Sequence, residues 1–402
     1  MPVPPPQAGI APIKNHRPSV RGLAPLYAAG FTTAFGAHSI AAGIGAESHN
    51  LGIALLTFGV LLAAYDLAEV ILKPVFGSLS DRIGAKPVII GGLLAFAVFS
   101  LLGTFAATPA MLSLVRLGQG AAASAFSPAS SAAVARMAGP AAAGRHFGKY
   151  GSWKGLGYVL GPLIGAGLIL AGGLPVLFLA LTAISCAVAL WTQCAMPNLP
   201  VLTRPRYTVI DLARQTGQRG FLIPTMALAG ATGALGIAVG FLPLLGTSLH
   251  LSLFGSMAVV ALLALSSTLI QPWVGRLRDD GHVSTGAGMA VGLAMIAVAV
   301  GILAVIPGVA TLYVSAVVLG VGIGITTPLG FGHLAATTPP ERMGRTMGTA
   351  EMGREIGDAG GPLLVGGIAS VASLAAGLGT LAIALAGMAA LCAVLLPRRP
   401  TP

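Results

Sequence analysis

Apolar residues gather along the chain in stretches of about 20 residues or more, and short polar segments separate these stretches. An α-helix needs a run of roughly that length to cross a hydrocarbon core of about 30 Å. The pattern therefore predicts an all-α membrane protein with twelve transmembrane helices. We place the helices at residues 23–45, 51–74, 87–107, 110–137, 147–172, 174–195, 221–246, 250–275, 284–307, 309–335, 346–372 and 374–396.

Three sequence blocks recur in the same order about half a chain later. The longest, residues 144–167, returns as residues 344–367, and residues 77–81 return as residues 275–279. Such a repeat indicates an ancestral unit that was duplicated, and it predicts two pseudo-symmetric six-helix bundles with a site between them. The expected domains are a tail (1–22), an N-terminal bundle (23–195), a linker (196–220), a C-terminal bundle (221–396) and a second tail (397–402).

Composition supports the membrane assignment. Only 8% of the 402 residues are charged, against roughly 25% in soluble domains, so most of the surface must face lipid. The Lys and Arg residues of the loops all fall on one side of the predicted helices. By the positive-inside rule, both termini and the linker are cytoplasmic, and we expect a multi-pass protein of the inner membrane. The net charge of +11 thus indicates topology, and we expect no nucleic-acid partner.

The turn after the second stretch carries a recognisable motif. Residues 77–87 read GSLSDRIGAKP and resemble the G-x-L-x-D-R-x-G-x-K signature of the major facilitator superfamily, with Gly77, Asp81 and Arg82 at its marked positions. The Asp81 carboxylate could cap a helix N-terminus, or pair with Arg82 or Arg136, and so hold helix ends together in one of two conformations.

Two further motifs support the resemblance. The fourth stretch matches L-x-x-x-R-x-x-Q-G through Arg116. The fifth resembles the antiporter motif of the same superfamily, which is typical of exporters that exchange drugs or metabolites for protons. Its small residues also recur every fourth position, which suits close helix packing, and its proline can bend the helix. The matching residues are Gly148, Gly157, Gly161, Pro162 and Gly165, and Ala166 replaces the last glycine of the motif.

Ionisable residues inside the predicted helices are the main candidates for function, because charge within lipid is costly. Two sets of ionisable residues, one within residues 51–74 and one within residues 346–372, have helical spacing that places each set on a single face of its helix. We predict a shallow layer of ion pairs that closes the cytoplasmic gate, although a permanent ion-pair network would give the same pattern. The gate candidates are Glu69, Lys73, Glu351 and Arg354.

Deeper carboxylates suit proton coupling. At 1.5 Å per residue, Asp66 and Asp358 fall near the midplane of their helices. Burial favours the neutral form of a carboxylate and a nearby cation favours the charged form, so movement between the two settings binds and releases a proton. Arg116 is the candidate cation, and Glu355 is the next candidate carboxylate. The first stretch holds only Glu47, at its outer end, so coupling is expected elsewhere.

Aromatic and basic side chains predict the substrate cavity. Four of them share one face of the fifth stretch. The intramembrane charges nearly balance, so they select neither cations nor anions as substrate. The cavity candidates are Tyr65, Arg116, Tyr150, Trp153, Lys154 and Tyr158.

These features together predict a secondary transporter that exports a small molecule in exchange for protons by alternating access. A proton symporter that imports a sugar or organic acid, or a uniporter, would share the same fold and charges. The sequence contains no G-x-x-x-x-G-K-[ST], H-E-x-x-H or G-x-S-x-G motif, so neither ATP hydrolysis nor enzymatic activity is expected. We expect a monomer in the bilayer, with the substrate and protons as ligands and with no metal or cofactor.

Overall fold

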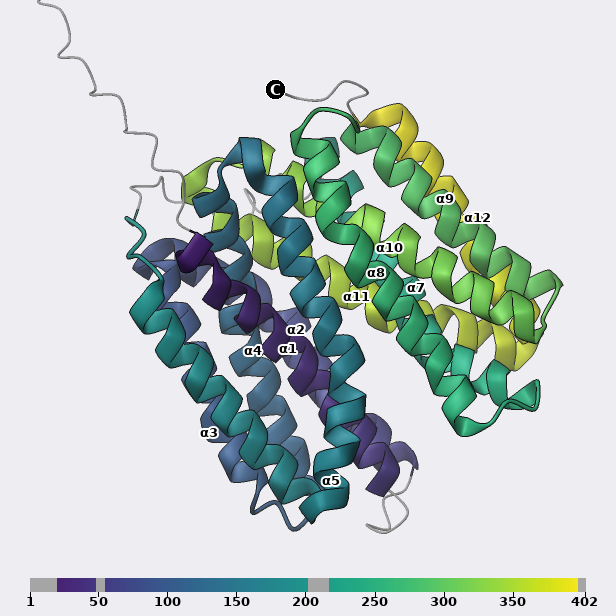
Figure 1. Cartoon of the computed structure of the whole chain (residues 1–402), viewed down its shortest axis with the longest axis horizontal. Helices are drawn as coiled ribbons and strands as arrows, with labels where there is room; N and C mark the ends of the chain where they lie inside the picture. Colours follow the sequence, from purple (N-terminus) through teal and green to yellow (C-terminus); the bar gives the residue numbers. More distant parts are fainter. Residues whose placement is uncertain (1–19, 48–54, 202–216, 397–402) are drawn as a thin grey trace, which may run out of the picture.

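The computed structural model describes residues 20–47, 55–201 and 217–396, and these residues are almost entirely helical (Figure 1). The predicted tails and most of the linker lie outside the described residues. No β-strand occurs in the described ranges. The helices are α1 (Val20–Glu47), α2 (Leu55–Ile83), α3 (Ala85–Gly103), α4 (Pro109–Ala138), α5 (Ala143–Ala195), α7 (Arg219–Ser248), α8 (Leu253–Asp279), α9 (Thr285–Val305), α10 (Val309–Thr337), α11 (Met343–Val371) and α12 (Leu374–Leu395), with short 3₁₀ turns at Pro140–Ala142 and Pro340–Arg342.

Helix α5 contains two of the predicted membrane spans. Its backbone leaves helical geometry at Gly172 and Gly173. Gly173 has φ 76°, a left-handed conformation that glycine adopts without the steric cost of a Cβ. The break separates residues 143–171 from residues 174–195, so the all-α, twelve-helix prediction is confirmed.

Length and hydropathy alone identify fewer spans. Within the described residues, seven helices are long and apolar enough to cross a membrane, and α5 with its preceding turn counts as one of them. Helices α1, α2, α4 and α11 are not among the seven, and α2 and α11 share one reason. Both carry several charged side chains in their interiors, which lowers their hydropathy.

Local chemistry sets several helix starts. Side chains of Thr108, Ser252, Ser284 and Ser373 each accept a hydrogen bond from a backbone N–H in the first turn of the helix that follows. This capping satisfies a donor that has no partner within the helix. A single residue, Gly84, joins α2 to α3, and its φ of 97° is accessible to glycine.

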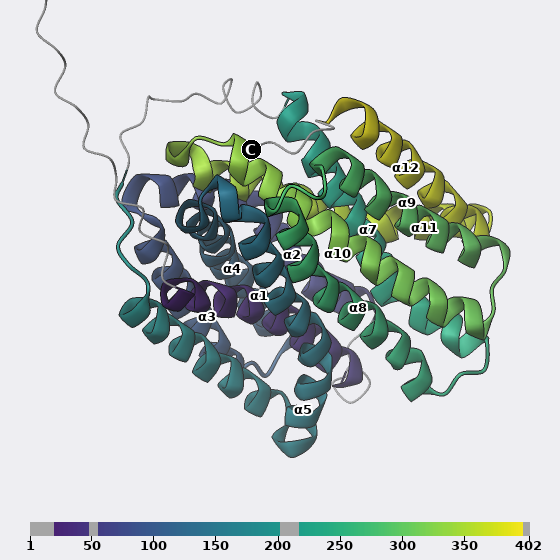
Figure 2. The same cartoon turned by 45° about the horizontal axis from the view of Figure 1, so that its top comes forward.

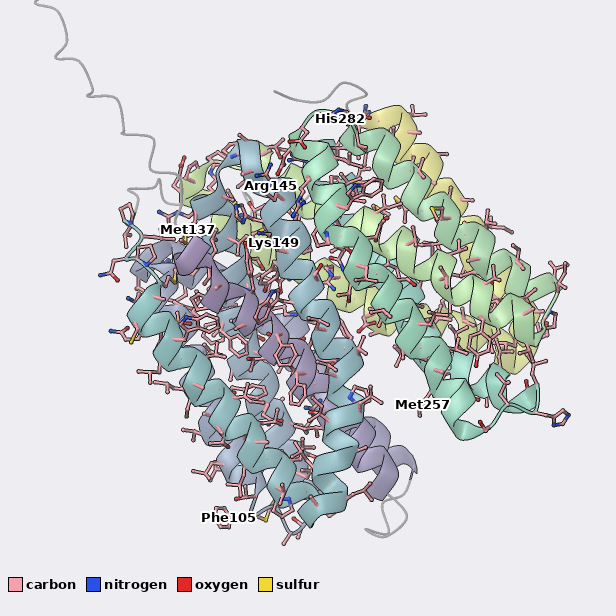
Figure 3. All side chains as sticks on the ribbon, in the orientation of Figure 1. Phe105, Met137, Arg145, Lys149, Met257 and His282 are labelled. Atoms are coloured by element: carbon pink, nitrogen blue, oxygen red, sulfur yellow. The ribbon has the colours of Figure 1, made fainter. Side chains whose placement is uncertain are left out.

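The helices form two groups, α1–α5 and α7–α12, which lie side by side (Figures 1 and 2). His282 and Arg145 lie toward one end of the molecule, and Phe105 lies at the opposite end (Figure 3). Helix α2 packs against α11, and α5 packs against α8, so these two pairs join the groups.

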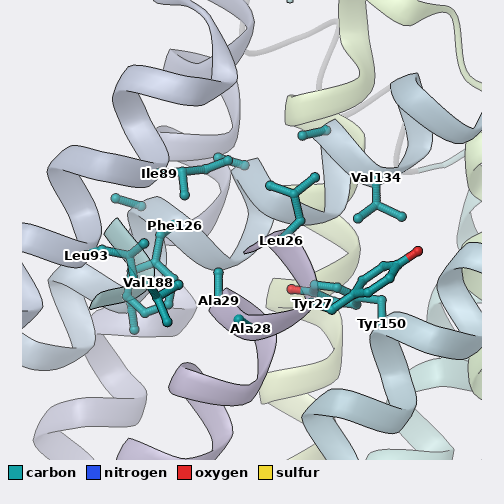
Figure 4. Packing of buried hydrophobic residues seen from close by; sticks show 14 of the residues in the cluster. Leu26, Tyr27, Ala28, Ala29, Ile89, Leu93, Phe126, Val134, Tyr150 and Val188 are labelled. Atoms are coloured by element: carbon teal, nitrogen blue, oxygen red, sulfur yellow. The ribbon is translucent and has the colours of Figure 1, made fainter. Parts of the chain in front are cut away.

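Buried apolar side chains form two clusters in the described part of the chain. One is centred on α1–α5 and includes Leu26, Leu93 and Phe126 (Figure 4). It extends into the other group through residues such as Phe331 and Met347. The second cluster belongs mostly to α7–α12. Two cores agree with a duplicated unit, while the domain boundaries drawn from the sequence remain a prediction.

Candidate functional site

The carboxylate of Asp81 joins the two helix groups. Its Oδ1 accepts a hydrogen bond from the N–H of Gly344 at 2.8 Å, and its Oδ2 accepts one from the N–H of Arg345 at 2.9 Å. These donors belong to the first turn of α11, where N–H groups lack helical partners and the helix dipole is positive. Helix capping, one of the alternatives that the sequence left open, is therefore observed.

Asp279 makes the equivalent contact in the opposite direction. Its Oδ1 accepts from the N–H of Gly144 at 2.9 Å, and its Oδ2 accepts from the N–H of Arg145 at 2.6 Å, in the first turn of α5. Arg278 also contacts this carboxylate, at 3.1 Å. Asp279 was not among the predicted site residues, although its place in the repeat of residues 77–81 is the signal that would have identified it. We call the end of the molecule that carries both contacts the capped end.

Of the two arginines considered as partners of Asp81, Arg136 lies near enough to act on it electrostatically. Arg82 is exposed. Arg136 donates from Nη2 to the carbonyl oxygen of Pro200 at 2.6 Å. Arg136 therefore ties the end of α4 to the segment that follows α5.

Glycine makes the helix contacts at the capped end possible. A Cβ added to Gly77 would collide with the carbonyl oxygen of Gly344, and one added to Gly275 would collide with that of Gly144. Backbone oxygens cannot turn aside as a flexible side chain can, so the two helix pairs need glycine at these positions.

Lys73 is the centre of a buried charge cluster between α2 and α11. Its Nζ lies 2.5 Å from Glu355 Oε1, 3.1 Å from Glu69 Oε2 and 3.9 Å from Glu351 Oε2. The side chain of Lys73 is fully buried. The structure thus brings together three of the four gate candidates and adds Glu355, which the sequence analysis had considered for proton coupling.

The cluster also reaches α4. Both carboxylate oxygens of Glu351 accept hydrogen bonds from serine hydroxyls, one from Ser127 at 2.5 Å and one from Ser131. The sequence analysis missed these serines, because their hydroxyls carry no charge and serine is common in transmembrane helices. Glu351 therefore connects α11 to both α2 and α4.

The predicted gate ion pair of Arg354 is not formed. No carboxylate of the described residues lies within 4.0 Å of its guanidinium. The guanidinium instead lies 5.7 Å from the ring centroid of Phe331 in α10, a distance that permits a cation–π contact. Spacing along α11 placed Arg354 on the same face as Glu351, but the position beside Lys73 is occupied by Glu355.

The two deep carboxylates differ in exposure. Asp66 is exposed, and Asp358 is partly buried. Asp358 lies against Gly236 of α7, where a Cβ would come within 2.8 Å of its Oδ1. Neither carboxylate forms an ion pair within the described part of the chain.

Arg116 is buried within the first helix group. Its guanidinium carbon lies 4.3 Å from the ring centroid of Tyr65, and its Nη1 donates to Gln119 Oε1 at 3.4 Å. Gln119 in turn donates to the hydroxyl of Ser100 at 2.9 Å. Arg116 is thus held by aromatic and amide groups, with no ion pair to a described carboxylate.

A cavity of about 50 Å³ lies between α5, α7, α8, α10 and α11. Of the predicted substrate residues, Tyr150, Lys154 and Tyr158 line it, whereas Tyr65 and Arg116 do not. Trp153 is 37% exposed and also lies outside it. The α5 helix turns Trp153 away because a single residue step rotates a side chain by about 100° around a helix. Residues of the lining that the sequence analysis missed include Gln271, Phe331 and Arg354.

The glycines of the antiporter motif serve two contacts. Gly157, Gly161 and Gly165 lie directly against the backbone of α1, between Phe31 and Ser39. Gly148 instead lies against Gln271 and Pro272 of α8. The stripe therefore has the close-packing role that its spacing suggests, and the effect of the motif on transport direction remains a prediction.

The helices and these contacts between the halves define a helical protein built of two bundles. A sequence profile described as Major Facilitator Superfamily matches residues 26–287 and 226–402. The chain belongs to this superfamily of multi-pass membrane proteins.

Individual relatives cover only part of the chain. It is 30% identical over 178 residues to a probable actinorhodin transporter of Streptomyces coelicolor, which is 43% of this chain and 31% of the relative. It is 34% identical over 127 residues to the class H tetracycline resistance protein of Pasteurella multocida, which is 31% of each chain. The matched region thus spans about a third of the length of these relatives.

A solved structure matches nearly the whole chain. The human organic anion transporter MFSD10 (TETRAN) superposes with a TM-score of 0.75 and 18% sequence identity, over 92% of this chain and 99% of that one. At this identity the likeness shows the fold alone.

Proposed function

We propose that this protein is a proton-coupled antiporter that exports a small molecule across a bacterial-type inner membrane by alternating access. The observation that carries the proposal is the buried cluster in which one ammonium, Lys73, contacts three carboxylates between the two bundles. Bringing several buried carboxylates to one cation is costly unless the charge is compensated. A proton bound near this cluster reduces the excess negative charge, and its release accompanies separation of α2 from α11.

The relatives support export of drug-like compounds. Two have names that refer to tetracycline resistance, and another is named as a puromycin resistance protein. The antiporter-type glycine motif of α5 supports the same direction of transport. In this proposal the substrate is a drug-like compound or a metabolite.

The capped end is the cytoplasmic end, and both termini are cytoplasmic. Basic residues support this orientation, since Arg145, Lys149 and Arg278 all lie near the capped end. With α5 and α11 capped from the opposite bundle, the cytoplasmic side is closed and the protein faces outward. Breaking the Asp81 and Asp279 contacts opens it inward. The protein works as a monomer, with two bundles bounded as the sequence predicts.

Asp66 or Asp358 carries the transported proton in this mechanism. Asp66 is exposed, and Asp358 is partly buried at the α7–α11 contact. The Lys73 cluster forms when α2 and α11 are in contact and breaks when they separate. Glu355 is the next candidate for the proton carrier. Arg116 stabilises the charged form of the carrier when the two approach.

Transport in inside-out vesicles tests the function, with tetracycline and puromycin as probes. Wild-type vesicles that are acidified inside should accumulate a probe, and dissipating the pH gradient should abolish accumulation. Asp66→Asn or Asp358→Asn should remove gradient-driven accumulation while exchange of labelled for unlabelled probe persists, because exchange needs no net proton movement. The control is Asp280→Asn, which removes an exposed carboxylate at the capped end.

The same experiment separates the alternatives. Accumulation driven by the reverse gradient would identify a symporter and overturn export. Probe movement that ignores the gradient in the wild type would identify a uniporter. If both variants retain coupling, the carrier is neither aspartate, and Glu355→Gln is the next variant to measure.

A further inference from the structure

The cavity between the bundles is lined by two cations and by no carboxylate. Its sixteen lining residues include Lys154 and Arg354, and no Asp or Glu is among them. Both side chains are well buried, since Lys154 is 5% exposed and Arg354 is 7% exposed. Neither forms an ion pair with any carboxylate that the structure describes. Carboxylates act on both cations only from beyond ion-pair distance, and two buried cations without a direct anionic contact leave room for a ligand to compensate their charge.

The nearby carboxylates make their direct contacts with Lys73 and act on Lys154 and Arg354 only at longer range. Glu69, Glu351 and Glu355 are arranged around Lys73, and two serine hydroxyls also hold Glu351. The intramembrane positive and negative charges are nearly equal in number, but they are not evenly distributed. These acidic residues lie at the α2–α11 contact, and the two cations line the cavity beside α5.

The guanidinium of Arg354 is oriented but incompletely bonded. Its contact with the Phe331 ring fixes one face, and its buried Nε has no hydrogen-bond partner. Gln271 also lines the cavity, and its buried Oε1 lacks a partner as well. Gly151 makes room for this amide, because a Cβ at that position would collide with Gln271 Oε1. These groups provide donors for an anion and one acceptor for a neighbouring hydroxyl or N–H.

The volume of the cavity and the residues that line it limit which chemical group can bind there. A volume of about 50 Å³ admits a group the size of a few water molecules, each of which needs at least about 10–15 Å³ on this measure. That is the size of a carboxylate and is too small for a whole drug-like molecule. Leu235, Leu263 and Ile323 supply an apolar wall beside the polar groups. The rest of a substrate would therefore be apolar where it adjoins the head group.

We infer that the transported compound is an organic acid whose carboxylate, or a similarly small anionic group, binds between Lys154 Nζ and the Arg354 guanidinium. This inference rests on the proposed transport function and names its substrate class. The apolar part of the acid lies against α7, α8 and α10. Binding compensates the two cations, so an acid is favoured over a neutral or cationic compound of the same shape.

Binding of matched compounds to the purified full-length protein tests the inference. The probes are a panel of small aromatic and aliphatic carboxylates, beginning with 2-naphthoate, each with its primary amide and its amine counterpart. Equilibrium dialysis in detergent should show acids binding about tenfold or more tightly than their amides, since charge-assisted hydrogen bonds are about twice as strong as neutral ones. Lys154→Gln and Arg354→Gln should each reduce this preference to about twofold or less.

Two controls keep the result specific to the charge in the cavity. Lys149→Gln removes a cation from the same helix that does not line the cavity, and it should keep the wild-type preference. Lys154→Arg should retain acid binding. The acid-to-amide ratio is measured within one preparation, so a partly unfolded variant does not change it. Absence of acid binding across the panel, equal binding of acids and amides, or an unchanged ratio in both glutamine variants would overturn the inference.

This test and the vesicle test fail independently. If a neutral or cationic probe is driven by the proton gradient and Lys154→Gln has no effect on it, the antiporter proposal stands and the acid-binding inference fails. If acids bind with the expected preference but do not respond to a gradient in vesicles, the acid-binding inference stands and the antiporter proposal fails.

Discussion

At the scale of single residues, Lys73 is a fully buried charge with three carboxylate neighbours. It has no solvent contact, and its three carboxylate neighbours come from α2 and α11. A buried cation in such a setting stabilises the fold mainly because its loss leaves the carboxylates uncompensated. Arg354, only a few residues from two of these acids, is bound by an aromatic ring instead.

Replacing Lys73 by methionine should destabilise the protein strongly. Removing one partner of a buried ion pair costs about 3–5 kcal/mol, so Lys73→Met should lower the unfolding temperature in detergent. Adding Glu355→Gln, which neutralises the carboxylate at 2.5 Å, should recover part of the loss. Lys86→Met is the control, because Lys86 bonds only to the carbonyl oxygens of Gln193 and Met196 near the surface. Equal unfolding temperatures for Lys73→Met and Lys86→Met would show that the cluster is not stabilising.

At the scale of helices, glycine determines how closely α2 and α11 approach. Gly77 faces the carbonyl of Gly344, and Gly348 faces the backbone of Lys73 and Pro74. The same arrangement recurs between α5 and α8 through Gly144, Gly148 and Gly275. Backbone contact of this kind brings the Asp81 carboxylate within reach of the N-terminus of α11.

Alanine at position 77 should force α2 away from α11 at the capped end and favour the opposite conformation. Its Cβ would meet a backbone oxygen, which cannot rotate away. Gly91→Ala is a matched control, because a Cβ at Gly91 meets no atom within 4 Å. The distance between spin labels on the capped ends of α2 and α11 should lengthen in Gly77→Ala and stay at the wild-type value in Gly91→Ala. Identical distance distributions in all three proteins would mean that the contact is not tight.

At the scale of the whole molecule, the two capping contacts follow the duplication. Asp81 of the first bundle caps a helix of the second, and Asp279 of the second caps a helix of the first. A charge–dipole contact of this kind is worth at most about 2 kcal/mol, so each can break and reform during a transport cycle. Two such contacts on the same side allow the bundles to open there as rigid bodies.

Orientation in the membrane can be tested at two exposed histidines. His250 follows α7, and His282 lies in the turn between α8 and α9 at the capped end. With Cys186, Cys194 and Cys392 replaced by alanine, a membrane-impermeant thiol reagent should label His250→Cys in intact cells. It should label His282→Cys only after the membrane is permeabilised. The opposite pattern would invert the proposed topology.

The sequence alone determined the number of helices, their approximate limits and the internal repeat. These properties depend on the length of apolar runs and on the order of residues along one chain, both of which are local. The break at Gly172–Gly173 fell where two predicted helices met. The possibility that Asp81 caps a helix was also visible, because a carboxylate near helix ends can accept hydrogen bonds from N–H groups that lack helical partners. The identity of the helix that Asp81 caps could not be predicted from the sequence.

Only the tertiary structure decided which charges meet. Spacing along α11 places Glu351, Arg354 and Glu355 near one face of the helix, but a face spans several neighbours. Packing against α2 gave Glu355 the position 2.5 Å from Lys73, and packing against α10 placed Arg354 over Phe331. The separation of acids from the cations of the cavity thus arises from how helices distant in sequence approach one another. A difference of an ångström or two in that approach decides whether two charges form a pair.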